Sequence, residues 1–221
     1  MSIVERYNNI QASVPSNVKI VAVSKTKPVQ MIEELYRETG HKIFGENKAQ
    51  EVHTKQSVLS KDIEWHFVGH LQTNKIKLIA PCISLIQSVD SYKLLYEINK
   101  EAKKNNRIIP CLLQFHIAKE EAKFGFSLDE AKKMLDSLPA NELTNISVMG
   151  VMGMATFTKD IPQIKAEFKL LYSYYNTLKS TYYSDSVYFN EISMGMSDDY
   201  LVAIDEGSTM IRIGSGIFGG R

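Results

Sequence analysis

The sequence has few cysteines and no long hydrophobic run. Its two cysteines, Cys82 and Cys111, stand apart without the spacing of a metal site or a redox motif, so we interpret them as reduced core thiols. No stretch approaches the roughly 20 apolar residues of a membrane span. The segment MSIVERYNNIQ also lacks the basic start and apolar core of a secretory signal. We therefore expect a cytoplasmic protein that does not bind membranes.

An excess of charge of either sign is also missing. Lys and Arg number 26 against 25 Asp and Glu, a formal net charge of +1, which excludes a general attraction to nucleic acid and favours a small-molecule partner. The cations Lys100, Lys103, Lys104 and Arg107 fall at the end of a predicted helix, where they complement its dipole, and we interpret them as a solvated face. No Gly-, Ser- or Pro-rich linker divides the chain, so residues 1–221 are expected to form a single domain. No exposed partner helix is obvious in the sequence, and we expect a monomer.

Strand-like and helix-like segments alternate after a predicted helix over residues 2–13. Short apolar runs, rich in β-branched residues, predict strands buried on both faces. Those strands are 19–24, 41–45, 64–69, 84–89, 108–115, 146–152, 186–193 and 209–215. Amphipathic segments separate them, with Pro28 near one helix start, Gly40 at its end and Asp90 as an N-cap. Eight βα units in 221 residues favour a (β/α)8 TIM barrel over a doubly wound sheet, which more often stops at about five to seven strands.

The residues just past each predicted strand form the candidate site, because a barrel builds its active site from the carboxyl ends of its strands. Most of these ends carry polar, hydrogen-bonding groups. The set comprises Ser24, Lys25, Glu46, Asn47, His70, Ser88, Asp90, His116, Met152, Ser193 to Ser197, Gly214 and Ser215.

Lys25 directly follows the first predicted strand and shares its pleat direction with Val21 and Val23. If these valines point into the barrel, the Lys25 amine lies over the barrel mouth. Desolvation there lowers a lysine pKa from its free value near ~10.4 and produces a nucleophile for carbonyl groups. Lys25 is thus a candidate for a Schiff base. Two alternatives stay open, an ion pair with Glu46 and a solvated side chain like that of Lys27.

Glycines stand beside hydroxyl groups after the last two predicted strands, in SMGMSDDY and RIGSGIFGG. Glycine lets backbone N–H groups close around an anion, and serine adds a donor. Barrels frequently bind phosphate in these two loops. The pattern predicts a phosphate cradle, although each glycine stretch taken singly is more often only a turn.

Arg212 lies inside the last predicted strand, two positions before Gly214. A strand arginine is costly to bury unless a carboxylate or a ligand acceptor meets it. The alternatives are an exposed strand end and a structural ion pair with Glu191 or Asp205.

Six motifs in order resemble the YggS/PROSC family, the pyridoxal phosphate homeostasis proteins: VAVSKTKP, FGENKAQE, WHFVGHLQTNK, GFSLDEA, SMGMSDDY and RIGSGIFG. The resemblance covers nearly the whole chain. It implies an alanine-racemase-like barrel of the fold-type III enzymes, with pyridoxal 5′-phosphate (PLP) as the cofactor and Lys25 as its Schiff-base lysine. The implied phosphate contacts are Ser193, Gly195, Gly214 and Ser215. The implied ring contacts are Arg212 at the pyridine nitrogen and Asn47, His70 and Met152 around the ring.

Three features depart from the family pattern. Ser215 replaces an expected threonine and keeps the hydroxyl group. His116 and Ala118 stand where asparagine and serine are more common, and GVMGMAT differs from the usual end of the sixth strand. These departures concern the substrate side of the cofactor.

The resemblance implies a protein of vitamin B6 homeostasis that binds PLP and buffers it or delivers it to PLP-dependent apoenzymes, with little or no catalysis. A fold-type III racemase has a second domain that supplies a tyrosine from the other subunit, and one barrel leaves no room for it. One alternative is a PLP-dependent amino-acid racemase or decarboxylase that uses Tyr or His from the loops. A second, from the lysine and the phosphate cradle alone, is a class I aldolase acting on a sugar phosphate.

Overall fold

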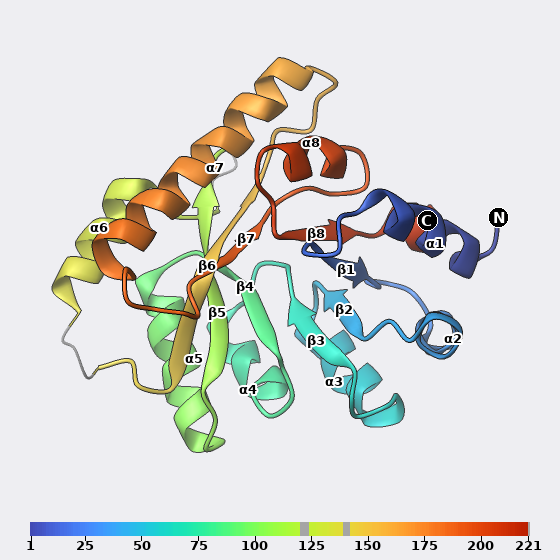
Figure 1. The fold of residues 1–221 in the computed structure, drawn as a ribbon. Helices are drawn as coiled ribbons and strands as arrows, with labels where there is room; N and C mark the ends of the chain where they lie inside the picture. The colour runs from blue at the N-terminus through green and yellow to red at the C-terminus, as the bar shows by residue number, and fades with distance from the viewer. Residues whose placement is uncertain (120–123, 139–141, 221) are drawn as a thin grey trace.

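Eight parallel strands close into a barrel in the computed structural model, which describes residues 1–119, 124–138 and 142–220 (Figure 1). The strands follow one another around the barrel in chain order, and β1 pairs with β8 to close it. They are β1 (Lys19–Val23), β2 (Ile43–Glu46), β3 (Glu64–Phe67), β4 (Leu85–Val89), β5 (Ile109–His116), β6 (Ile146–Met154), β7 (Glu191–Ser193) and β8 (Met210–Ile213). The predicted (β/α)8 barrel is confirmed.

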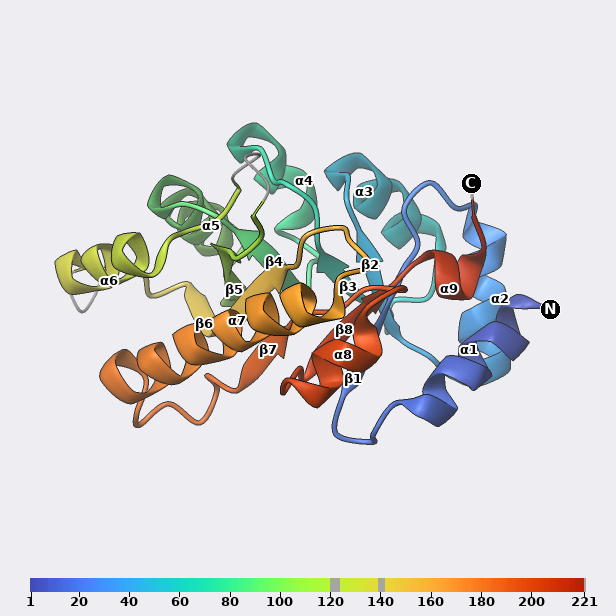
Figure 2. The same ribbon diagram turned by 90° about the horizontal axis from the view of Figure 1, so that it is seen from above.

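Helices surround the barrel on the outside (Figure 2). They are α1 (Ile3–Ser13), α2 (Val29–Thr39), α3 (Ala49–Val58), α4 (Ile76–Ile79), α5 (Tyr92–Lys104), α6 (Leu128–Ser137), α7 (Ile161–Tyr182), α8 (Tyr200–Asp205) and α9 (Ser215–Phe218), with a 3-10 turn, η1 (Thr73–Lys75), before α4. The first and last helices lie side by side, joined by a 2.6 Å hydrogen bond from Arg6 Nε to the carbonyl of Ile217. Within the described ranges, no helix combines the length and apolar character needed to cross a membrane.

Helix ends agree with the sequence signals except at α5. The α2 helix begins after Pro28 and ends at Gly40, whose positive φ of 71° is the left-handed conformation that glycine adopts easily. The predicted N-cap Asp90 is wrong, because Ser91 caps α5 and accepts from the Leu94 N–H. The Asp90 carboxylate accepts from His70 instead.

Two predicted strands differ from the observed ones in ways that affect the site. The strand predicted over 186–193 is confined to Glu191–Ser193, and Val187 before it is 76% exposed. By contrast, β6 runs to Met154, two residues past its predicted end, because it stays paired with β5 as far as His116. A strand that ends later carries different side chains to the barrel mouth.

The apolar residues form two layers. The larger layer lies between the strands and the surrounding helices, and a small cluster fills the barrel interior. The interior cluster comprises Val21, Val23, Leu85, Leu112, Met152 and Met210. Its packing is tight, since a Cβ added at Gly45 would come within 2.9 Å of the Val21 side chain. Val21 and Val23 therefore point into the barrel, as the Lys25 argument requires.

The basic cluster at the end of α5 has two roles. Lys100 and Lys104 pair with Glu97 and Glu101 on the helix surface, in agreement with a solvated face. Arg107 does not belong to this solvated face, because its guanidinium donates at 2.6 Å to the carbonyl groups of Ala80 and Ile83. It therefore ties the end of α4 to the start of β5.

Candidate functional site

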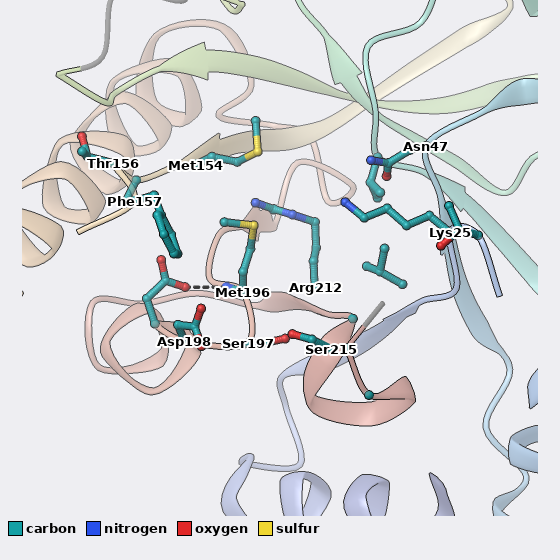
Figure 3. Close-up of a pocket in the computed structure, with 18 of the residues that line it drawn as sticks. Lys25, Asn47, Met154, Thr156, Phe157, Met196, Ser197, Asp198, Arg212 and Ser215 are labelled. Carbon is teal, nitrogen blue, oxygen red and sulfur yellow. Dashed lines mark hydrogen bonds between the residues drawn. The ribbon is translucent and has the colours of Figure 1, made fainter. Parts of the chain in front are cut away.

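A cavity of about 320 Å³ opens at the carboxyl ends of the strands (Figure 3). Its walls come from the loops that follow β1, β2, β6 and β7, from β8 and from the start of α9. The lining includes Lys25, Asn47, Met154, Met196, Arg212 and Ser215. A volume of this size suits a small organic ligand.

Lys25 extends from the loop after β1 into the cavity, on the side facing Arg212 (Figure 3). It is half-buried, and among the described residues its ammonium group has no hydrogen bond or ion pair. Glu46, the predicted alternative partner, lies 2.7 Å from Lys55 instead. Lys27 is not a solvated neighbour, because its amine donates to the carbonyls of residues 219 and 220 at 3.1 and 3.0 Å. Lys25 is therefore the amine left available to a ligand.

The turn that carries Lys25 is held by an ionic group that we call the Lys55 network: Ser24, Thr26, Glu46, Glu51 and Lys55. The Lys55 amine donates to Glu46 Oε1, Glu51 Oε2 and the Ser24 carbonyl at 2.7, 2.9 and 2.9 Å. Ser24 Oγ donates to Glu46 at 2.6 Å, and the Thr26 N–H donates to Glu51 at 2.8 Å. Thr26 has a φ of 63°, which is unfavourable for a β-branched residue. The network therefore holds a strained turn in place.

Glu46 is the most perturbed group of this network. Its side chain is fully buried, and its Oε2 atom has no hydrogen-bond partner among the described residues. Burial raises the pKa of Glu46 to about 7, against the opposing hydrogen bonds from Lys55 and Ser24. The network thus contains a carboxyl group that titrates near neutral pH.

Arg212 also lines the cavity, from the strand that pairs with β1, and is only 5% exposed. Its guanidinium donates to Ser193 Oγ at 2.6 Å and to the Gly153 carbonyl at 2.9 Å. Neither structural alternative holds, since the strand is buried and neither Glu191 nor Asp205 pairs with this arginine. A buried cation facing a cavity is suited to an acceptor atom of a ligand.

The electrostatics of this side leave the arginine charged. Burial lowers the pKa of Arg212 to about 10, and Asp199 opposes that change. Burial also raises the pKa of Asp199, whose carboxylate accepts from the Met196 N–H at 2.5 Å. Arg212 therefore remains a protonated donor at neutral pH.

The loop after β7 and the start of α9 form a wall of donors. Ser197 Oγ accepts from the Gly216 N–H at 3.2 Å and so joins the two segments. Gly214 and Ser215 line the cavity, and their backbone N–H groups donate to no atom in the described parts of the chain. Such free N–H groups beside hydroxyls are what a bound anion requires.

Five of the nine residues predicted to bind a cofactor line this cavity: Lys25, Asn47, Arg212, Gly214 and Ser215. The structure places His70 and Met152 elsewhere. His70 is at the surface, where it bonds Asp90 at 2.9 Å and packs at a tilt against the Phe124 ring. Met152 is fully buried in the interior cluster, and Met154 takes its expected place at the mouth because β6 continues two residues further.

Ser193 and Gly195 also lie away from the lining. Ser193 is fully buried below Arg212 because β7 directs its side chain into the barrel. Gly195 has a φ of 95°, and a Cβ there would come within 2.6 Å of Ala203, so this glycine allows the loop to pack on α8. Ser193 therefore holds Arg212 from below, and Gly195 sets the path of the loop that carries Met196.

Sequence reasoning assigned no role to Met154, Thr156, Phe157, Asp198 or Asp199, all of which line the cavity. The two aspartates lie in the SMGMSDDY motif, which was the available signal. The other three follow from the true end of β6. The departures at His116 and Ala118 lie off the lining, and residues 120–123 of that segment fall outside the described residues.

Comparisons with known proteins agree with this geometry. The family model "Alanine racemase, N-terminal domain" matches residues 2–221. The pyridoxal phosphate homeostasis protein of Aquifex aeolicus is 37% identical over 204 residues, which cover 92% of this chain and 87% of that protein. The chain belongs to the pyridoxal phosphate homeostasis family. The resemblance drawn from its motifs is confirmed.

Solved structures of the homeostasis family and of racemases share the fold. PipY of Synechococcus elongatus, solved with PLP bound, has a TM-score of 0.89 and 31% identity, covering 99% of this chain and all of PipY. An alanine racemase of Clostridium difficile has a TM-score of 0.77 at 15% identity and shows the fold alone. This chain covers 56% of that racemase, so it matches the barrel part of a longer enzyme.

Proposed function

We propose that this chain binds PLP in the cavity and serves as a cytoplasmic carrier that buffers the cofactor and delivers it to apoenzymes. The observation that carries the proposal is the Lys25 amine, which has no partner among the described residues and shares one cavity with Arg212. The N–H groups of Gly214 and Ser215, which are also free within the described ranges, line the same cavity. PLP supplies an aldehyde that condenses with an amine, a pyridine ring and a phosphate. The donor set fits all three parts, and the related PipY was solved with PLP bound.

Each residue has a distinct task in this proposal. Lys25 attaches the cofactor covalently, and Gly214 and Ser215 donate to its phosphate. Arg212 donates to the ring nitrogen and, because a guanidinium does not give up its proton at neutral pH, leaves that nitrogen unprotonated. Asn47 lines the same cavity beside the ring. An unprotonated ring withdraws electrons poorly, which disfavours transamination.

The lining also argues against racemase activity. Racemisation needs an acid/base group on each face of the cofactor, and Lys25 serves one face. Among the described residues, no tyrosine or histidine lines the cavity to serve the other. The same lack disfavours a decarboxylase that uses such a residue. The carrier role is therefore favoured over both enzyme alternatives. We further propose that residues 1–221 form one domain and that the carrier is a monomer.

Borohydride reduction of the PLP-loaded protein, followed by peptide mapping, tests the attachment. We expect the pyridoxyl label on Lys25, and Lys25→Ala should lose the visible absorption band of the bound cofactor. Lys75→Ala, a change outside the cavity lining, is the matched control and should keep it. A label on Lys27 or Lys75 contradicts the assignment, and a colourless protein that does not take up PLP contradicts the proposal in favour of the aldolase.

Two further measurements test the carrier role. The loaded protein should restore activity to a PLP-dependent apoenzyme, and it should turn over free amino acids far below about 1 s⁻¹. Turnover at ordinary enzymic rates would replace the carrier with the racemase. Size-exclusion chromatography with light scattering should give a mass near 25.0 kDa for the monomer.

A further inference from the structure

A chain of buried polar side chains runs from Arg212 into the barrel interior. Ser193 Oγ accepts from Arg212 at 2.6 Å and donates to Gln87 Oε1 at 2.6 Å. The amide nitrogen of Gln87 lies 3.0 Å from His66 Nδ1 and 3.1 Å from Met210 Sδ. Gln87 is fully buried and His66 is 5% exposed, so both face the protein interior alone. These side chains come from β3, β4 and β7 in addition to β8, and neither Gln87 nor His66 lines the cavity.

The direction of each hydrogen bond in this chain follows from the chemistry of its members. Burial lowers the pKa of His66 to about 3, with further effects of Lys19 and His41, so its ring is neutral at pH 7. The Gln87 carbonyl is occupied by the Ser193 hydroxyl, so its amide group donates to His66, and Nδ1 must be the unprotonated nitrogen. The proton of neutral His66 therefore resides on Nε2.

This order determines what Arg212 meets. The Gln87 carbonyl takes the Ser193 proton, and the oxygen of Ser193 then presents a lone pair to the guanidinium. The Ser193 oxygen and the Gly153 carbonyl each accept from one terminal nitrogen of Arg212, and together they fix the orientation of the guanidinium group. A buried hydrogen-bonded network loses rigidity when one of its members is removed, so loss of Gln87 should loosen the hold on Ser193 and Arg212.

We propose that Gln87, oriented by neutral His66, is a positioning residue that aims Arg212 at the ring nitrogen of the cofactor. The inference rests on the proposed PLP function and extends it to residues outside the cavity. Its consequence is specificity: the protein should prefer a cofactor with a ring nitrogen, and that preference should depend on Gln87. A Gln87 that merely fills the barrel interior would not influence this preference.

The test compares PLP with its 1-deaza analogue, in which a C–H group replaces the ring nitrogen. The variants are Gln87→Met and, as a matched control, Gln114→Met. Gln114 is also a buried barrel-strand glutamine, but its amide donates to the Phe124 carbonyl and stands outside the chain. Wild type should bind PLP about tenfold or more tightly than the analogue, the range expected for a hydrogen bond to a charged donor.

Gln87→Met should reduce this preference to about threefold or less, while Gln114→Met should keep it. An unchanged preference in Gln87→Met, or no preference in wild type, overturns the inference. If wild type binds neither compound, the proposed function has failed, which is distinct from equal binding of both. Affinity for inorganic phosphate should be the same in all three proteins, because the phosphate donors are elsewhere.

A measurement on the unaltered protein keeps the inference testable if Gln87→Met does not fold. Nitrogen-15 NMR of histidine-labelled protein should show His66 as the neutral tautomer with its proton on Nε2 at pH 7. A proton on Nδ1 would reverse the donor and acceptor roles in the hydrogen bond between His66 and Gln87, and this result would overturn the inference.

Discussion

Two cations of the cavity, Lys25 and Arg212, are held in place by different kinds of group. Lys25 stands on a turn held by the charged Lys55 network and has no partner in the part of the chain that the structure describes. Arg212 is held by neutral acceptors on both of its terminal nitrogens. The difference matches the proposed tasks, because an amine that reacts must be free, whereas a cation that recognises a ring must stay in place.

The buried groups behind the two cations, Glu46 for Lys25 and His66 for Arg212, also affect stability with opposite dependence on pH. The Glu46 pKa is raised by burial to about 7, so the stability contributed by this carboxyl group is present at low pH and is lost as the pH rises towards 7. The His66 pKa is lowered to about 3, so the stability that neutral His66 contributes is present above its unfolded pKa near 6.5 and lost as the pH falls towards 3. Within the pH dependence of the whole protein, these two contributions therefore oppose each other.

The largest expected effect on stability comes from breaking the Lys55 network. Lys55→Met leaves Glu46 and Glu51 without their buried cation, and the free energy of unfolding should fall by about 3–5 kcal/mol. Urea unfolding followed by circular dichroism measures it. Lys100→Met, which removes a surface pair with Glu97 and an exposed contact with the Tyr96 ring, is the control and should change stability by less than about 1 kcal/mol. Similar values for the two variants would show that the Lys55 network is not structural.

A smaller effect on stability is expected from Glu46→Gln, which isolates the contribution of Glu46 to the pH dependence. Between about pH 4.5 and 7 the unfolded chain releases the Glu46 proton and the folded protein keeps it, so stability contributed by this group declines as pH rises. Glu46→Gln removes that decline, and its stability relative to wild type should rise by about 1–3 kcal/mol across this window. Unfolding midpoints at several pH values measure the difference. A constant difference from pH 4.5 to 7 would contradict the raised pKa.

The next prediction concerns the donor wall on the Arg212 side. A Cβ at Gly214 would have only ordinary contacts, 3.5 Å from the Val23 carbonyl, so the fold accommodates a side chain there. Gly214→Val should nevertheless weaken PLP binding about tenfold or more, because the side chain occupies the space of the phosphate. Titration by absorbance measures the affinity, with urea unfolding as the control for folding. Equal affinity of wild type for pyridoxal and PLP would disprove the phosphate cradle.

The smallest effect is expected at Ser215. Its hydroxyl is one donor among several backbone N–H groups, so Ser215→Ala should weaken PLP binding only about threefold. The same titration measures it, and a loss as large as that of Gly214→Val would mean that the hydroxyl, and not the backbone, holds the phosphate.

Much of the barrel and the position of Lys25 were predictable from the sequence. The buried run before Lys25 predicts a strand, and the period of two in a strand places the lysine on the face of Val21 and Val23. Glycine and hydroxyl groups after the last two strands predicted the donor wall in the same way. These predictions depend on local periodicity and on the rule that parallel strands end at one face.

Contacts between distant residues were beyond the sequence. Lys55 reaches back from α3 to the turn after β1, and Ser193 meets Gln87 across 106 residues of chain. The end of β6 depends on how far β5 pairs with it, which decided that Met154 and not Met152 lines the cavity. The sequence by itself determined which side chains point into the barrel, because pleat alternation is local. Only the tertiary structure decided which buried polar groups meet, because barrel closure brings strands from the whole chain together.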